Sequence, residues 1–241
     1  MFAAVALITG LVLGSFISAY SYRVPRLVSW VRGRSFCPKC KNRISWFDNI
    51  PLVSYLVLLG RCRSCKKKIS LRYPLIELTT ALGFVAVSYF NYPVYFYFLV
   101  PLLICIFVID LENQFIPDGL VFFGIVLTFF YFILIDKNTI YLNLLSGFTP
   151  AFFLLFLHLV TRGKGMGLGD VKLAILGGLV LGWPYFVVWL FLSFIIGAVV
   201  GIVLIFAKKA SFGKKIPFGP YLVISFWLTM ICGNWFLAFL R

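Results

Sequence analysis

The acidic residues of this chain are few enough to consider one by one, since there are seven among 241 residues. Four of them fall in two short segments that border long apolar runs. These are Asp110, Glu112 and Asp118 in IDLENQFIPDG and Asp170 in GMGLGDVKLA. Two carboxylates that share a proton can divide a hydrolysis, because one activates water while the other donates to the substrate carbonyl. Asp110 and Asp170 are the candidate pair for this aspartic-protease chemistry.

Three glycines, Gly165, Gly167 and Gly169, precede Asp170. Glycine adds little bulk, so a substrate backbone could approach the carboxylate closely. A nucleotide-binding loop is disfavoured because the segment lacks the G-x4-G-K-[ST] pattern. A plain helix N-cap by Asp170 stays open as the structural alternative. The single histidine, His158, lies in an apolar run, where we expect a hydrogen-bonded histidine rather than a member of a covalent triad.

Four of the six cysteines form two C-x2-C pairs, Cys37/Cys40 and Cys62/Cys65, with 21 residues between the pairs. This spacing lies just outside the usual range for four-cysteine zinc sites, and four thiolates leave no open coordination position. The pattern therefore predicts a structural zinc site. Disulfides are disfavoured in a reducing compartment, and a redox dithiol normally occurs once rather than as a matched pair.

The elements that position these residues must be membrane helices. The chain is 62% hydrophobic with a mean hydropathy of +1.04, whereas soluble domains have about 45–50% apolar residues. The sequence predicts an all-α polytopic membrane protein with about eight transmembrane helices and a small cytoplasmic zinc-binding domain inserted after the first helix. The predicted spans are 1–22, 74–90, 95–111, 119–135, 140–160, 173–183, 185–207 and 217–240. The sixth is short and could start earlier or be interfacial.

The basic residues predict the orientation. Segment 23–73 holds 13 of the 22 lysines and arginines, and cytoplasmic loops concentrate such residues. With the N-terminus outside, seven more fall in inner loops, and only Lys137 and Arg241 fall outside. The inner group of seven is Arg162, Lys164, Lys172, Lys208, Lys209, Lys214 and Lys215. Both aspartates and the zinc domain are then cytoplasmic, and the charge reflects topology and attraction to membrane lipid rather than nucleic-acid binding.

The ordered set of motifs resembles the type IV prepilin peptidase family, the prepilin leader peptidase/N-methyltransferases. GSF at 14–16 with YRVP at 22–25 is similar to the family's N-terminal signature, and segment 36–78 is similar to its zinc-binding domain. IDLENQFIPD matches the segment that carries the first catalytic aspartate, GLGDVK the second, and IPFGP at 216–220 a stretch before the last span. One departure is Ser18-Ala19, where the family often has Asn-Val.

The resemblance implies that Asp110 and Asp170 cleave the basic leader of type IV prepilins or pseudopilins of pilus and type II secretion systems, at the cytoplasmic face of the bacterial inner membrane. It also implies methylation of the new N-terminus with S-adenosylmethionine, whose binding residues are not identified. The expected domains are the first helix at 1–22, the basic zinc-binding domain at 23–73 and the peptidase core at 74–241. The alternative is a zinc-stabilised membrane transporter with an acidic cation or proton site. The oligomeric state is not predicted.

Overall fold

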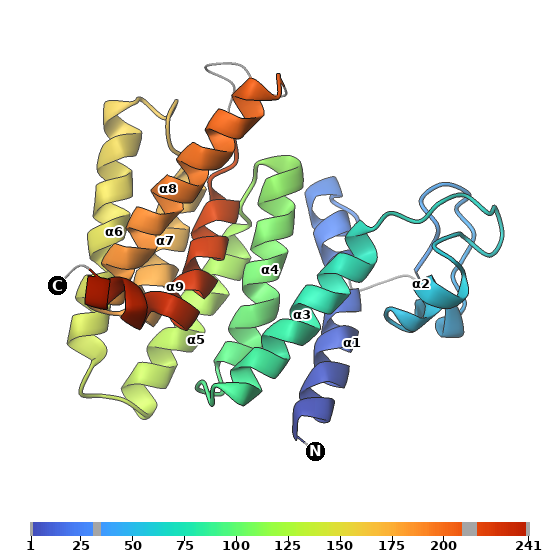
Figure 1. Ribbon diagram of the computed structural model, residues 1–241, viewed down its shortest axis with the longest axis horizontal. Coiled ribbons are helices and arrows are strands. Elements are labelled where there is room, and N and C mark those ends of the chain that lie inside the picture. Colours follow the sequence, from blue (N-terminus) through green and yellow to red (C-terminus); the bar gives the residue numbers. More distant parts are fainter. Residues whose placement is uncertain (1, 31–34, 209–215, 240–241) are drawn as a thin grey trace. The chain divides into compact units, whose positions relative to one another are not determined.

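The computed structural model describes residues 2–30, 35–208 and 216–239 (Figure 1). Within these ranges the chain is helical, and β-structure is limited to two isolated bridges. The long helices are α1 (Phe2–Arg23), α3 (Arg72–Tyr89), α4 (Phe96–Asn113), α5 (Asp118–Leu134), α6 (Ile140–Val160), α7 (Leu168–Leu181), α8 (Tyr185–Phe206) and α9 (Gly219–Phe239). Short elements between α1 and α3 are η1 (Val24–Arg26), η2 (Trp46–Asn49) and α2 (Val53–Val57).

The all-α prediction is confirmed for the described residues, and each predicted apolar segment coincides with one long helix. Five of these helices, α1, α4, α6, α8 and α9, are long and apolar enough to cross a membrane. Helix α7 begins at Leu168, five residues before the predicted start. Its 14 residues span only about 21 Å, less than the roughly 30 Å of a hydrocarbon core, so the count of eight spans stays a prediction.

Some of the sequence predictions fall on residues outside the described ranges. They include the outermost residues of the first and last predicted spans, Met1 and Leu240. They also include six of the basic residues used to predict orientation, which are Arg32, Arg34, Lys209, Lys214, Lys215 and Arg241.

The chain divides into two compact units, residues 1–105 and 106–241, and the boundary falls within α4. In the first unit α1 packs along α3 (Figure 1). Gly10 and Gly14 permit this approach, since a Cβ on either would lie 2.6 Å from the backbone Cα of Ala81 or Glu77. Small residues spaced four apart allow membrane helices to pack closely. The domain boundaries expected from the sequence, after residues 22 and 73, remain predictions.

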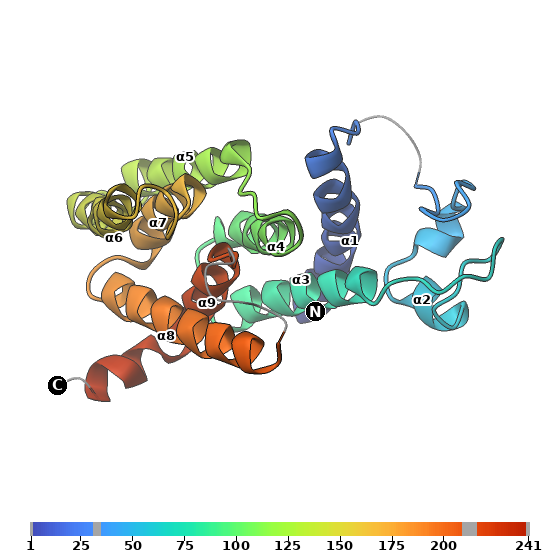
Figure 2. The same ribbon diagram turned by 90° about the horizontal axis from the view of Figure 1, so that it is seen from above.

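Helix α7 is the central helix of the second unit, where it packs against α5, α6, α8 and α9. Figures 1 and 2 both show α7 beside α6. Gly178 of α7 lies against Gly147 of α6, where a Cβ on Gly178 would come 2.9 Å from the Gly147 Cα. Nine of the 14 residues of α7 are buried, including Asp170. The helix that presents this carboxylate is therefore held on several sides by packing.

Candidate functional site

Asp110 lies near the C-terminal end of α4, and its side chain is buried, with 5% of the residue exposed. Its Oδ2 accepts a hydrogen bond from the backbone N–H of Gly219 at 3.0 Å. Gly219 is the first residue of α9 and is followed by Pro220, a residue that suits the start of a helix because its ring presets φ. A Cβ at position 219 would lie 2.6 Å from the same carboxylate oxygen, so this approach requires glycine.

Asp170 lies in the first turn of α7 and is 7% exposed. Its Oδ2 accepts a hydrogen bond at 3.1 Å from the backbone N–H of Gly167, which is the N-cap residue. Asp170 therefore does stabilise the start of the helix, as the structural alternative expected, but from the third helical position rather than from the N-cap. Among the described residues, this is the one hydrogen bond recorded for the carboxylate.

The two aspartates come together within the second unit. Their carboxylates lie close enough to interact electrostatically, although α5 and α6 separate them in the chain. Ile116 links the two segments, because its side chain lies against the backbone of both Gly169 and Gly219. Cβ atoms at those glycines would lie 3.0 Å from Ile116 Cβ and 3.2 Å from Ile116 Cδ1, respectively.

The other two acids of the predicted cluster are exposed rather than buried. Asp118 forms an ion pair with Lys172, whose Nζ lies 2.8 Å from both carboxylate oxygens. This pair joins the first turn of α5 to the second turn of α7. Glu112 is exposed near the end of α4. Of the four acids in the two motifs, Asp110 and Asp170 are thus the two that combine burial with mutual proximity.

His158 is hydrogen-bonded, in agreement with the expectation for a histidine in an apolar run. Its Nδ1 lies 2.7 Å from the carbonyl oxygen of Met166, so the nitrogen donates and carries a proton. A Cβ at Gly163, which has a φ of +72°, would lie 3.2 Å from the ring, so the imidazole lies beside this glycine. The His158 side chain therefore stabilises the glycine-rich loop before Asp170 through its hydrogen bond to Met166.

The four predicted metal-binding cysteines lie together in the first unit. The Sγ atoms of Cys37, Cys40, Cys62 and Cys65 are all within 4.8 Å of one another. Tetrahedral coordination with Zn–S bonds of about 2.3 Å places sulfurs about 3.8 Å apart, so the cluster fits zinc. Cys105 and Cys232 lie in helices outside it, and Cys105 is buried, as expected for a small apolar side chain.

The two C-x2-C segments fold as a structural repeat, which the sequence did not reveal. In each, the N–H of the first cysteine donates to the carbonyl five residues on, and its own carbonyl accepts from the N–H four residues on. These bonds pair Cys37 with Asn42 and Lys41, and they pair Cys62 with Lys67 and Lys66. Lys41 and Lys66 both have positive φ, at 62° and 55°. Two matched turns therefore present two thiols each.

Two family models match consecutive parts of this chain. The model of the type IV leader peptidase family matches residues 97–202, and that of the bacterial peptidase A24 N-terminal domain matches residues 8–91. A prepilin leader peptidase/N-methyltransferase of Pseudomonas putida is 33% identical, over 97% of this chain and 91% of that protein. The protein of the same name from Neisseria gonorrhoeae is 33% identical, over 97% of this chain and 94% of that protein. The chain belongs to the type IV leader peptidase family. No solved structure matches it significantly.

Membership of the leader peptidase family, together with the long apolar helices, identifies a multi-pass protein of the bacterial inner membrane. The family resemblance inferred from the motifs is confirmed, and the transporter alternative gains no support. Both aspartates fall in the part matched by the leader peptidase model, and all four clustered cysteines fall in the N-terminal part. The sequence did not predict that Gly219 and Ile116 contribute to this site. Gly219 was noted only as part of the IPFGP motif.

Proposed function

We propose that this chain cleaves the basic leader of type IV prepilins or pseudopilins at the cytoplasmic face of the inner membrane, with Asp110 and Asp170 as the catalytic pair. It then N-methylates the new N-terminus. The observation that carries the proposal is the proximity of these two buried carboxylates, 60 residues apart in sequence, on segments that both lie against Ile116. The prepilin leader peptidase/N-methyltransferases supply the substrate class and both activities.

In the proposed hydrolysis one carboxylate accepts a proton from water as the water oxygen attacks the peptide carbonyl carbon. The other carboxylic acid donates its proton to the carbonyl oxygen. When the C–N bond then breaks, the departing nitrogen takes up a proton and leaves as the new N-terminal amine. The backbone N–H groups of Gly219 and Gly167 orient one carboxylate each. A single proton shared by the pair makes activity depend on one protonated and one ionised carboxyl group.

Two cofactors belong to the proposal. S-adenosylmethionine supplies an electrophilic methyl group to the new amine. Zinc would be held by Cys37, Cys40, Cys62 and Cys65 as a structural cross-link, because four thiolates fill a tetrahedral shell and leave no site for a substrate. The proposed topology has eight spans, one for each predicted apolar segment. The N-terminus is placed outside because the 13 basic residues of segment 23–73 favour the cytoplasmic side.

The experiment that tests the proposal is incubation of the purified full chain with a synthetic leader–helix peptide, with and without S-adenosylmethionine, followed by mass spectrometry. We expect cleavage in both samples and a mass increase of one methyl group only with the donor. An intact peptide in both samples would contradict the peptidase function. Cleavage without methylation would contradict only the second activity.

A further inference from the structure

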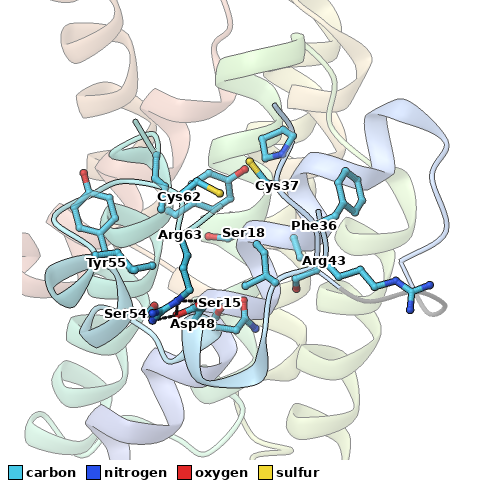
Figure 3. A pocket seen from close by; sticks show the side chains of 18 of the residues that line it. Ser15, Ser18, Phe36, Cys37, Arg43, Asp48, Ser54, Tyr55, Cys62 and Arg63 are labelled. Atoms are coloured by element: carbon cyan, nitrogen blue, oxygen red, sulfur yellow. Dashed lines mark hydrogen bonds and ion pairs between the residues drawn. The ribbon is translucent and has the colours of Figure 1, made fainter. Parts of the chain in front are cut away.

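A pocket lies in the first unit between the segment that joins α1 to α3 and the adjoining ends of these two helices. Its lining includes Ser15 and Ser18 from α1, Glu77 from α3, and Asp48 and Arg63 from the segment between these helices. Figure 3 shows the two serines and the paired side chains of Asp48 and Arg63 gathered around it. The proposed peptide cleavage uses none of these residues, all of which belong to a different compact unit from the aspartate pair.

Ser18 supplies the first sign of a ligand. Its hydroxyl oxygen is buried and has no hydrogen-bond partner in the described structure, and only 2% of the residue is exposed. A buried hydroxyl without a partner costs free energy, so most native proteins satisfy such groups. Ser18 is also the position at which the chain departs from the Asn-Val of the family pattern. A polar ligand in the pocket would give this hydroxyl its missing partner.

Glu77 supplies the second sign. It is 8% exposed, and its Oε2 accepts a hydrogen bond from the backbone N–H of Leu52 at 2.9 Å. The Ser15 side chain also lies near this carboxylate in the lining of the pocket. The structure records no ion pair for Glu77 among the described residues. A buried carboxylate whose recorded hydrogen-bond donor is neutral is stabilised by a positive group beside it, so a cationic group of a ligand would complete its pairing.

The remaining polar lining carries both signs of charge. Arg63 donates to both carboxylate oxygens of Asp48, with contacts of 2.7, 2.8 and 3.1 Å, and lowers the pKa of that carboxyl below its usual value. This pair places a partly buried acid beside a guanidinium. The aromatic rings of Tyr22 and Tyr73 also line the pocket. A simple anion would not use Glu77, and a simple cation would not use the arginine.

We propose that this pocket binds S-adenosylmethionine, the sulfonium methyl donor of the N-methyltransferase activity. The Glu77 carboxylate faces a positive group of the donor, and the Ser18 hydroxyl forms a hydrogen bond with a polar atom of the donor. S-adenosylmethionine combines a sulfonium, an ammonium, a carboxylate and a planar adenine ring, which matches a lining with both charges and aromatic faces. The inference rests on the proposed methyltransferase function. An anionic lipid headgroup is the competing occupant, and the buried carboxylate disfavours it.

The test is equilibrium dialysis of radiolabelled S-adenosylmethionine against the full chain in nanodiscs, together with peptide cleavage. We expect Glu77→Gln to weaken donor binding about 10- to 100-fold, because a hydrogen bond to a charged group is lost. Glutamine keeps an acceptor for Leu52 N–H, so the local fold is preserved. Ser18→Ala should weaken binding several-fold. The matched control is Thr229→Val in α9, which removes the other buried hydroxyl that has no partner in the described structure and should leave binding unchanged.

Measuring leader-peptide cleavage by the same variants distinguishes the donor-binding inference from the proposed peptidase function. We expect Glu77→Gln to cleave at the wild-type rate, and Asp110→Asn to bind the donor normally without cleaving. Unchanged donor affinity in both pocket variants would overturn the inference and leave the function intact. Arg43 also lines the pocket. Competition of the donor by short-chain phosphatidylglycerol, lost in Arg43→Ala but retained in Glu77→Gln, would assign the pocket to lipid instead. Circular dichroism and metal content of each variant show whether it is folded.

Discussion

The backbone N–H of Gly219 donates to Oδ2 of Asp110 at 3.0 Å, across 109 residues of sequence. The bond connects the start of α9 to the end of α4 and orients one carboxylate of the proposed pair. Because the glycine hydrogen faces the oxygen, any larger side chain at 219 must displace the carboxylate or the helix.

Gly219→Ala is therefore expected to reduce cleavage about 100-fold, since a displacement of about 1 Å in a catalytic group can cost that much. The measurement is the rate of leader-peptide cleavage by purified protein. Gly119→Ala is the matched control, because no atom lies within 4 Å of a Cβ at that position. Equal activity in the two variants would show that the Gly219–Asp110 contact does not matter for catalysis.

Asp110→Asn and Asp170→Asn should each abolish cleavage while the protein still inserts in the membrane. An amide cannot exchange the proton that the hydrolysis requires. Asp118→Asn is the control, since it removes only the exposed ion pair with Lys172, which is worth about 0–1 kcal/mol. Substantial cleavage by either of the first two variants, measured by mass spectrometry of the peptide products, would rule out the pair.

Cys37→Ser combined with Cys62→Ser should lose bound zinc, because one thiolate is removed from each of the two matched turns. The check is elemental analysis of purified protein. Cys232→Ser serves as the control, as this cysteine is half-buried in α9 and outside the cluster. Wild-type zinc content in the double variant would exclude this ligand set.

His158→Ala should lower the cleavage rate several-fold, because the loop before Asp170 loses one hydrogen bond, worth about 1 kcal/mol. His158→Asn places an amide N–H near the position of Nδ1–H and should recover much of the rate. Rates measured at saturating peptide isolate this effect from peptide binding. If the alanine and asparagine variants are equally impaired, the hydrogen bond to Met166 is not what the histidine contributes.

Local pattern in the sequence was sufficient to predict several features of this protein. The hydropathy of the apolar runs predicted where the long helices lie. In a membrane, each apolar segment must satisfy its own backbone hydrogen bonds, and a helix does so without help from other segments. The C-x2-C spacing predicted which cysteines cluster, because two residues between ligands suit one turn. The motifs predicted the family.

Tertiary structure alone decided the relationships that join distant segments. The hydrogen bond from Gly219 to Asp110 and the placing of Ile116 between two glycines depend on how α4, α7 and α9 pack, and no local pattern encodes that packing. The sequence placed the start of α7 at residue 173 and left an earlier start open. Packing decided for Leu168, because glycine-rich residues have a low intrinsic helix propensity and neighbouring helices stabilise the first turn. The burial of the Ser18 hydroxyl and of the Glu77 carboxylate likewise depends on how α1, α3 and the segment between them pack together, which no local pattern encodes.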